Sequence, residues 1–380
     1  SRRQRQMCIR DRLEGIYKAK PDVLCFSCYI WNLDYVEQLM DEYHQICPEV
    51  PIWVGGPEVS YETEAFLKAH PQVTGAMVGE GEETFLELCE SYAKAGIGEM
   101  AEKMNLSGIK GIMYRAGESL VKTGAREPLD LNRIPFCYGG VEDFRNRIIY
   151  YESSRGCPFR CSYCLSSVEK TLRFRDVERV KKELAFFLEQ EVAQVKFVDR
   201  TFNCRHEHAM EIWKFLIEHD NGVTNFHFEI SADLLTDEEI ALIGQMRPGL
   251  IQLEIGVQST NDATITEIHR TMQLDRLKAV VRSIQEKENI HEHLDLIAGL
   301  PFEDYDTFAK SFDEIYELRP NQLQLGFLKV LKGSYMYEHA KEYEIEYHSR
   351  PPYEVLKTKW LPYEDVLKTV SYTHLRAHET

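Results

Sequence analysis

The chain is predicted to be an α/β protein, with an incomplete Rossmann-like parallel sheet over residues 13–107 and a partial (β/α)6 barrel over residues 147–331. Short apolar strands alternate with amphipathic helices in both regions, which indicates parallel sheets covered by helices. Polar and apolar residues alternate along two strands of the second region, which indicates a barrel with a polar interior.

The first region is predicted to contain three short apolar strands and two helices. In chain order these elements are 22–30, 33–46, 51–55, 76–79 and 82–93. Gly55 and Gly56 follow the second strand, and Gly79 and Gly81 follow the third. Open α/β sheets bind ligands at the carboxyl ends of their strands, where glycine lets the backbone approach closely. A purely structural role stays open, because turns between strand and helix favour glycine in any case.

A connector over residues 108–146 is predicted to lead from the first region to the second. It begins with a hairpin formed by 111–115 and 119–122, and Pro128 and Pro135 interrupt regular structure beyond it.

The second region is predicted to repeat strand and helix about six times. The strands are 148–153, 193–199, 224–231, 250–257, 292–298 and 321–328, and the helices are 172–190, 206–219, 236–246, 273–288 and 304–318. Six such units form three-quarters of a (β/α)8 barrel, whose functional residues lie at the carboxyl ends of the strands.

Polar side chains share one face of the third and fourth of these strands. They are His227, Glu229, Ser231, Asp233, Gln252, Glu254 and Gln258. Because helices cover the outside of such a barrel, this face is expected to line a substrate cleft. The alternative is a polar face in solvent, which would suit an antiparallel sheet better.

Three cysteines, Cys157, Cys161 and Cys164, follow the first of these strands within eight residues. Iron–sulfur clusters require thiolate ligands, and three ligands would leave one iron of a four-iron cluster open. Two alternatives stay open. A zinc site would need a fourth ligand, for which only Cys204 and the histidines beside it are available. Buried structural thiols would behave as small hydrophobic groups, but the residues between them make a poor apolar segment.

The CxxxCxxC spacing after a first strand, with Tyr163 before the last cysteine, resembles the radical S-adenosylmethionine (SAM) superfamily. The resemblance implies a [4Fe–4S] cluster on Cys157, Cys161 and Cys164, which would be both the metal ligands and catalytic residues. The fourth iron would bind the amino and carboxylate groups of SAM. An external low-potential electron donor of the flavodoxin or ferredoxin type would then drive cleavage of SAM to methionine and a 5′-deoxyadenosyl radical.

The resemblance also implies cofactor-binding roles elsewhere in the barrel. Tyr163 is one of the implied cofactor-binding residues. Asp199 and Asn203 are implied at the SAM amino group, and Glu254 and Gln258 near the ribose and methionine moieties. Arg270 is implied at the SAM carboxylate, and Gly299 in the turn that packs on adenine. An always-charged, forked guanidinium group suits a carboxylate. His206 and His208 are instead expected to be surface residues, because a metal site would need further partners.

A Rossmann-like region ahead of CxxxCxxC resembles the cobalamin-binding branch of the superfamily. The resemblance implies that Gly55, Gly56, Gly79 and Gly81 contact cobalamin, and that methyl transfer is the commonest reaction. The chain contains no Asp-x-His-x-x-Gly segment, whose histidine ligates cobalt in some relatives. Many members of the branch are thought to bind cobalamin without it.

The composition of the chain limits the classes of partner that it is expected to bind. A net charge of −17 without a long basic run argues against nucleic acid as the main partner and favours a small or peptidic substrate. No apolar run approaches the ~18 residues of a membrane span, and no secretory signal is evident. The ten cysteines suit a reducing compartment. A cytoplasmic protein with no membrane partner is therefore expected.

Both ends are expected to be foreign to the fold. Residues 1–12 and 370–380 show no period of a helix or strand and resemble translated sequencing adaptor, so disorder is expected there. Residues 332–369 are expected to begin a C-terminal domain that is cut short, and the first strand of the first region is expected to be missing.

The predicted function is reductive cleavage of SAM, with cobalamin as a second cofactor. Two alternatives stay open: a radical SAM enzyme without cobalamin, and a non-enzymatic electron-transfer or sensing module that uses the cluster alone. The last alternative predicts no SAM binding.

Overall fold

The computed structural model describes residues 2–95, 106–140, 144, 147–168 and 171–375. The chain forms two compact units, of which the first contains Ser1–Leu129 and Ser349–Tyr353 and the second contains Asp130–His348 and Glu354–Thr380. None of the helices in the described part of the chain combines the length and apolar character that a membrane span requires.

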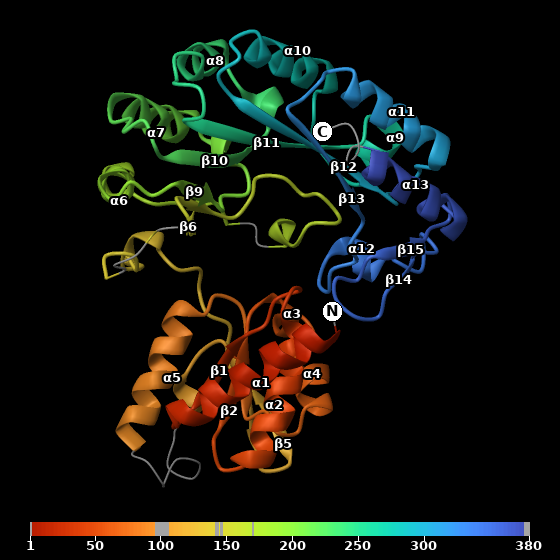
Figure 1. Cartoon of the computed structure of the whole chain (residues 1–380). Helices are drawn as coiled ribbons and strands as arrows, with labels where there is room; N and C mark the ends of the chain where they lie inside the picture. Colours follow the sequence, from red (N-terminus) through yellow and green to blue (C-terminus); the bar gives the residue numbers. More distant parts are fainter. Residues whose placement is uncertain (1, 96–105, 141–143, 145–146, 169–170, 376–380) are drawn as a thin grey trace. The chain divides into compact units, whose positions relative to one another are not determined.

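The first unit contains a five-stranded sheet in the order β1-β2-β3-β4-β5 (Figure 1). The strands are β1 (Leu24–Ser27), β2 (Ile52–Gly55), β3 (Gly75–Met77), β4 (Ile112–Ala116) and β5 (Ser119–Lys122), and the helices are α1 (Arg2–Ala19), α2 (Leu33–Ile46), α3 (Pro57–Ser60), α4 (Thr63–Ala69) and α5 (Glu82–Ala95). The first three strands are parallel, as predicted. The predicted hairpin also forms, but it pairs antiparallel with β3 and so completes this sheet. This pairing satisfies the edge of β3 that would otherwise be open.

Helix α2 shows why the sequence predicted these elements well. Its buried residues Leu33, Val36, Met40 and Tyr43 recur at helical spacing and pack toward the core that contains Ile52. The predicted bounds of this helix are confirmed.

The prediction of disorder at the two ends is wrong for the described residues. Helix α1 begins at Arg2, and α13 (Tyr363–Leu375) continues past residue 370. Residues 376–380 lie outside the described part of the chain. Helix α1 consists largely of good helix formers, which compensates for a weak apolar period. Helix α13 contains few of them, but it buries Val366 and packs against α11 and β13.

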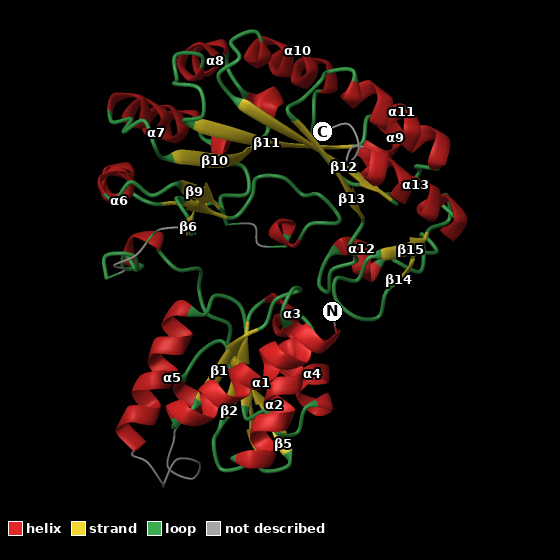
Figure 2. Cartoon of the chain, in the orientation of Figure 1, coloured by secondary structure: helices red, strands yellow, loops and turns green. Residues whose placement is uncertain are grey.

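The second unit is built on a six-stranded parallel sheet in the order β13-β12-β11-β10-β9-β6. The strands are β6 (Ile148–Tyr151), β9 (Gln194–Phe197), β10 (Asn225–Ile230), β11 (Ile251–Gln258), β12 (His291–Ala298) and β13 (Gln322–Phe327). The helices that follow them are α6 (Val177–Glu189), α7 (His206–Glu218), α8 (Asp237–Ile243), α10 (Leu274–Gln285) and α11 (Tyr305–Tyr316). Figure 2 shows the helices outside the curved sheet. The predicted partial (β/α)6 barrel is confirmed.

The helices and the outer face of the sheet share one hydrophobic core, which includes Leu184, Trp213, Phe228, Leu253 and Val281. Along β11, apolar residues are buried and alternate with partly exposed polar ones. The polar residues face the lumen, as predicted, and the use of this lumen as a substrate cleft stays a prediction. The remaining short elements are β7 (Ser154–Arg155), β8 (Arg173–Phe174), α9 (Asp262–Glu267) and the 3-10 helices η1 (Leu106–Gly108), η2 (Leu131–Arg133), η3 (Leu165–Ser167), η4 (Phe202–Cys204) and η5 (Ala232–Leu234).

Residues 332–369 do not form a separate domain here. They contain α12 (Tyr335–Glu338), β14 (Glu346–Tyr347), β15 (Val355–Lys357) and the start of α13, and all four elements belong to the second unit. Met336, Tyr343 and Val355 share an apolar cluster with Leu300 and Leu328 of the barrel. The aromatic residues of this segment therefore extend the barrel core.

Candidate active site

A cavity of about 240 Å³ lies in the barrel lumen, toward the carboxyl ends of the strands. It is lined by Cys157, Phe159, Cys161, Tyr163, Cys164, Arg200, Thr201, Glu229, Ile230, Ser231, Glu254, Gly256, Gln258, Arg270 and Asp295. The three cysteines share this cavity with four of the residues predicted to bind SAM, namely Tyr163, Glu254, Gln258 and Arg270.

The cysteine loop is attached to its neighbours through backbone hydrogen bonds. The Ser162 amide donates to the Ile268 carbonyl at 2.9 Å, and the Ser162 carbonyl accepts from the Met336 amide at 2.9 Å. At the start of the loop, Gly156 has φ +95°, and an added Cβ would lie 2.5 Å from the Thr171 carbonyl oxygen. Only glycine fits such an approach, so the position of the cysteines depends on this turn.

Arg270 reaches the cysteine loop from the segment after β11. One terminal nitrogen lies 3.7 Å from Cys161 Sγ, and the other donates to the Gly256 carbonyl. The Nε atom of Arg270 and the Oε1 atom of Gln258 are buried without a hydrogen-bond partner in the described structure. Buried polar atoms are nearly always paired in native proteins, so both atoms indicate a place for a polar ligand.

The carboxylates of the lumen differ in environment. Glu254 lies 3.1 Å from both His227 Nε2 and Lys196 Nζ, and its hydrogen bond with His227 lowers its pKa to about 2. Glu229 has neither a hydrogen bond nor an ion pair in the described part of the chain, and burial together with the nearby Glu254 charge raises its pKa to about 7. Burial also raises the pKa of Asp295. One carboxylate is therefore already neutralised by cations, and another is available to a ligand.

Glu229, Asp295 and Arg200 were not predicted as site residues. Glu229 had already been placed on the polar face of its strand, and the same alternation in β12 brings His291, His293 and Asp295 to one face. The period of two along β12 would therefore have found Asp295.

Asp199 and Asn203 do not line the cavity, and their place at the SAM amino group stays a prediction. Asp199 is fully buried and accepts hydrogen bonds from the Ser153 amide, the Ser153 hydroxyl and the Ser154 hydroxyl at 2.6–2.9 Å. Asn203 forms two hydrogen bonds with the backbone of Ser231. Both side chains fix the turns that carry the site.

Gly299 does not line the cavity either. It has φ +89°, and an added Cβ would lie 2.8 Å from a methyl carbon of Val355. Its structural role is to let the start of β15 approach the end of β12.

In the first unit, the glycines at the carboxyl ends of β2 and β3 differ in how much space surrounds them. Gly56 has φ +100°, and an added Cβ would lie 2.6 Å from the Cys28 carbonyl oxygen. Gly79 also has positive φ, but nothing lies within 4 Å of an added Cβ there or at Gly81. Gly55 would make only ordinary contacts with Met77. The backbone at Gly79 and Gly81 is therefore open to an incoming ligand.

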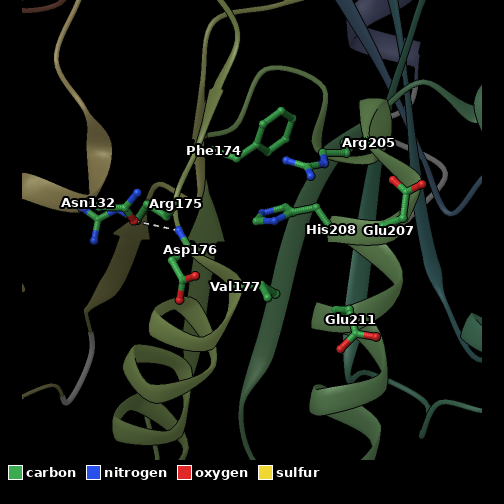
Figure 3. A pocket seen from close by; sticks show the side chains of 9 residues that line it. All are labelled: Asn132, Phe174, Arg175, Asp176, Val177, Arg205, Glu207, His208 and Glu211. Carbon is green, nitrogen blue, oxygen red and sulfur yellow. Dashed lines mark hydrogen bonds between the residues drawn. The ribbon is translucent and has the colours of Figure 1, made fainter.

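A second cavity, of about 350 Å³, lies beside α7 in the second unit and contains none of the three cysteines. Figure 3 shows Arg205 and His208 projecting from the beginning of α7 toward the segment that leads into α6. The expectation that His208 is a surface residue is wrong: it is buried and lies 3.1 Å from the Ser153 hydroxyl. Burial lowers its pKa to about 4, so it is neutral at physiological pH. His206 is exposed, as expected, with its ring 3.0 Å from Glu239.

In the described residues, no three His, Cys, Asp or Glu side chains come together closely enough to hold one metal ion. A cubane cluster spaces its thiolate ligands more widely than a single ion does, so three sulfurs around one cavity still suit a cluster.

Family comparisons agree with this geometry. The Radical SAM superfamily model matches residues 151–315, and the B12 binding domain model matches residues 4–89. A third model, described as a protein of unknown function (DUF4080), matches residues 341–371. The chain therefore contains a radical SAM domain over residues 151–315. A B12 binding domain precedes it over residues 4–89.

The curated relatives include two methyltransferases. The cobalamin-dependent radical SAM methyltransferase TokK of Streptomyces tokunonensis is 27% identical over 331 residues, which cover 81% of this chain and 46% of the relative. The 2-(S-pantetheinyl)-carbapenam-3-carboxylate methyltransferase of Streptantibioticus cattleyicolor is 28% identical over 322 residues, which cover 78% and 45%. The chain thus spans about half the length of these relatives.

Solved structures share the fold. The radical SAM methyltransferase TsrM from Kitasatospora setae, with cobalamin and a [4Fe–4S] cluster bound, has a TM-score of 0.72 at 15% identity, and the match covers 92% of this chain and 73% of TsrM. The cobalamin-dependent radical SAM enzyme OxsB has a TM-score of 0.66 at 17% identity, with coverage of 97% and 55%.

Proposed function

We propose that this chain is the cofactor-binding part of an enzyme that cleaves SAM reductively, with cobalamin as a second cofactor for methyl transfer or a related radical reaction. The observation that carries the proposal is the arrangement of Cys157, Cys161 and Cys164 around one lumen cavity together with Arg270. The methyltransferases among its relatives support methyl transfer as the reaction class.

The three cysteines would hold a [4Fe–4S] cluster. Thiolates are the ligands that such clusters require, and the motif supplies three of four. When bound, the cluster supplies one electron to the sulfonium of SAM, which breaks the bond between sulfur and C5′ and yields methionine and a 5′-deoxyadenosyl radical. The electron comes from an external low-potential donor of the flavodoxin or ferredoxin type.

The other lumen residues would bind the charged ends of SAM. Arg270 suits the carboxylate, because its guanidinium is always charged and its Nε atom has no protein partner in the described structure. Glu229 suits the ammonium group, because its carboxylate forms no ion pair with another described residue. Gln258 has a free Oε1 atom that can accept from a ribose hydroxyl. Glu254 would instead order His227 and Lys196.

Cobalamin would lie at the carboxyl edge of the first sheet. Parallel α/β sheets bind ligands at this edge, and the open backbone at Gly79 and Gly81 allows a large ligand to approach. The substrate would be a small molecule or a peptide, and the enzyme would act in the cytoplasm.

Anaerobic reconstitution with iron and sulfide, followed by dithionite and SAM, tests the proposal. We expect the wild type to produce 5′-deoxyadenosine and Cys161→Ala to produce none. Cys204→Ala is the matched control, since Cys204 does not line the cavity, and it should keep the activity. Equal product from the wild type and Cys161→Ala would refute the assignment. A protein that binds a cluster but not SAM would be an electron-transfer module instead.

A further inference from the structure

We propose that the stacked side chains of Tyr29 and Trp31 form the surface on which the corrin ring of cobalamin lies. The inference rests on the proposed cobalamin binding by the first unit, and it assigns residues that no sequence motif singled out. Three observations support it. The two rings are exposed, the loop that carries them is held by hydrogen bonds, and they lie at the carboxyl edge of the sheet.

The two rings form an exposed aromatic surface. Their centroids are 4.5 Å apart with an interplanar angle of 9°, and 69% of Trp31 and 36% of Tyr29 is exposed. Trp31 is the most exposed of the large hydrophobic residues in the described part of the chain. An apolar surface of this kind on a soluble domain commonly marks a binding site.

The loop that carries the rings is held in one conformation. The Tyr29 amide donates to Asn32 Oδ1 at 2.7 Å, and Asn32 Nδ2 donates to the Ser27 carbonyl at 2.8 Å. The Asn32 amide donates in turn to the Tyr29 carbonyl at 3.0 Å. Because the turn is already ordered, a ligand that contacts the rings loses little affinity to loop ordering.

The rings lie at the edge of the sheet where a ligand is expected. They follow β1, whose neighbour β2 ends at Gly55 and Gly56. The Cys28 amide donates to the Gly55 carbonyl at 2.7 Å, so the two loops are adjacent. An aromatic surface and the open backbone at Gly79 and Gly81, after the neighbouring strand β3, thus occur at one edge. This combination suits a broad, flat ligand with a polar rim better than a compact charged one.

The same loops contain neither a histidine nor an exposed thiol. Residues 28–32, 55–57 and 79–81 contain no histidine. Their one thiol, Cys28, is fully buried, and burial raises its pKa to about 12. Tyr29 and Trp31 are the exposed large hydrophobic residues of these described loops, and they offer an aromatic contact to the corrin face.

Hydroxocobalamin binding to the full chain tests the inference. We expect Trp31→Ala to weaken binding about three- to tenfold, the size of a lost aromatic stacking contact. Trp31→Phe should keep most of the affinity, because it retains an aromatic face. Tyr17→Ala is the matched control: Tyr17 is 53% exposed, but it precedes β1 and so lies at the opposite edge of the sheet. It should bind as the wild type does.

Each outcome has one meaning. If the wild type and Trp31→Ala bind hydroxocobalamin equally, the inference is wrong while the proposed cofactor stands. If Trp31→Ala and Tyr17→Ala lose affinity equally, the loss is not specific to the carboxyl edge, and the inference is also wrong. If the wild type does not bind hydroxocobalamin, both the inference and the proposed second cofactor fall, while SAM cleavage is tested separately through Cys161→Ala.

Discussion

The barrel lumen and the carboxyl edge of the first sheet are both formed by parallel strands. The lumen presents side chains to a ligand, whereas the edge of the first sheet presents backbone. In the lumen, strand residues project charged side chains such as Glu229, Glu254 and Asp295 into one cavity. At the edge of the first sheet, Gly79 and Gly81 leave the backbone bare. Ligand binding in the lumen therefore depends on functional side chains, whereas ligand binding at the edge depends on the absence of side chains. Substitutions that remove side-chain atoms should impair the lumen, and substitutions that add them should impair the edge.

The largest effect is expected at Arg270, where a charged group is removed from the lumen. Arg270→Ala should weaken SAM binding to the reconstituted protein by 30-fold or more, since loss of a buried charged partner costs about 2–5 kcal/mol. Equilibrium dialysis with labelled SAM measures this. Arg282→Ala, on the exposed side of α10, should have no effect. An unchanged SAM affinity in Arg270→Ala would show that SAM binding in the lumen does not depend on this side chain.

The next effect is expected from one added methyl group at the edge of the first sheet. Gly56→Ala places Cβ 2.6 Å from the Cys28 carbonyl oxygen at φ +100°, and we expect it to lower the free energy of unfolding by about 3 kcal/mol. Gly79→Ala is the matched variant with positive φ but open space, and it should cost only about 1 kcal/mol. Urea denaturation compares the two. Equal losses would show that backbone conformation alone, not contact with Cys28, decides the effect.

A smaller effect on stability is expected at Asp199, which binds the residues just before the cysteine loop. Asp199→Asn replaces an oxygen that accepts hydrogen bonds with a group that donates, opposite the donors of Ser153 and Ser154. We expect a loss of roughly 2 kcal/mol in stability and a lower iron content after reconstitution. Asp237→Asn, at a residue whose side chain is 91% exposed, should stay within about 0.5 kcal/mol of the wild type. A stable Asp199→Asn variant with full iron content would show that the support is dispensable.

The last effect depends on pH and is expected behind the lumen, at Glu292 on the helix-facing side of β12. Its carboxyl group is fully buried, and burial raises its pKa from 4.5 to about 8. The folded state therefore holds this proton more tightly than the unfolded state, and stability falls as the pH rises from about 4.5 to 8.

Glu292→Gln cannot ionise, so it should remove this part of the pH dependence. We expect it to raise the stability at pH 8 by several kcal/mol, since each pKa unit of the shift corresponds to about 1.4 kcal/mol, and to change it little at pH 4, where the carboxyl group and the amide are both neutral. Thermal unfolding at both pH values measures the difference. A parallel shift at the two pH values would exclude ionisation of Glu292 as the cause.

Sequence reasoning succeeded where a local period decides which face a residue occupies. The apolar spacing of α2 predicted both its bounds and its buried face, and the alternation along β11 predicted that Glu254 and Gln258 face a cleft. It did not anticipate the contacts of Asp199 and Asn203, which lie in the turns between β9 and α7, or the burial of His208 in the first turn of α7. In a turn the backbone has no fixed period, so nothing local shows whether a polar side chain points into the cavity or satisfies a neighbouring loop.

By itself, the sequence determined the order of strands and helices, the polar face of the lumen and the CxxxCxxC motif, because each depends on residues close together in the chain. Only the tertiary structure decided that Arg270 reaches Cys161, that Glu229 stays unpaired while Glu254 does not, and that β4 pairs with β3. These facts depend on packing between segments far apart in the chain. There the available partners and the exclusion of water, rather than local preference, set which contact is most stable.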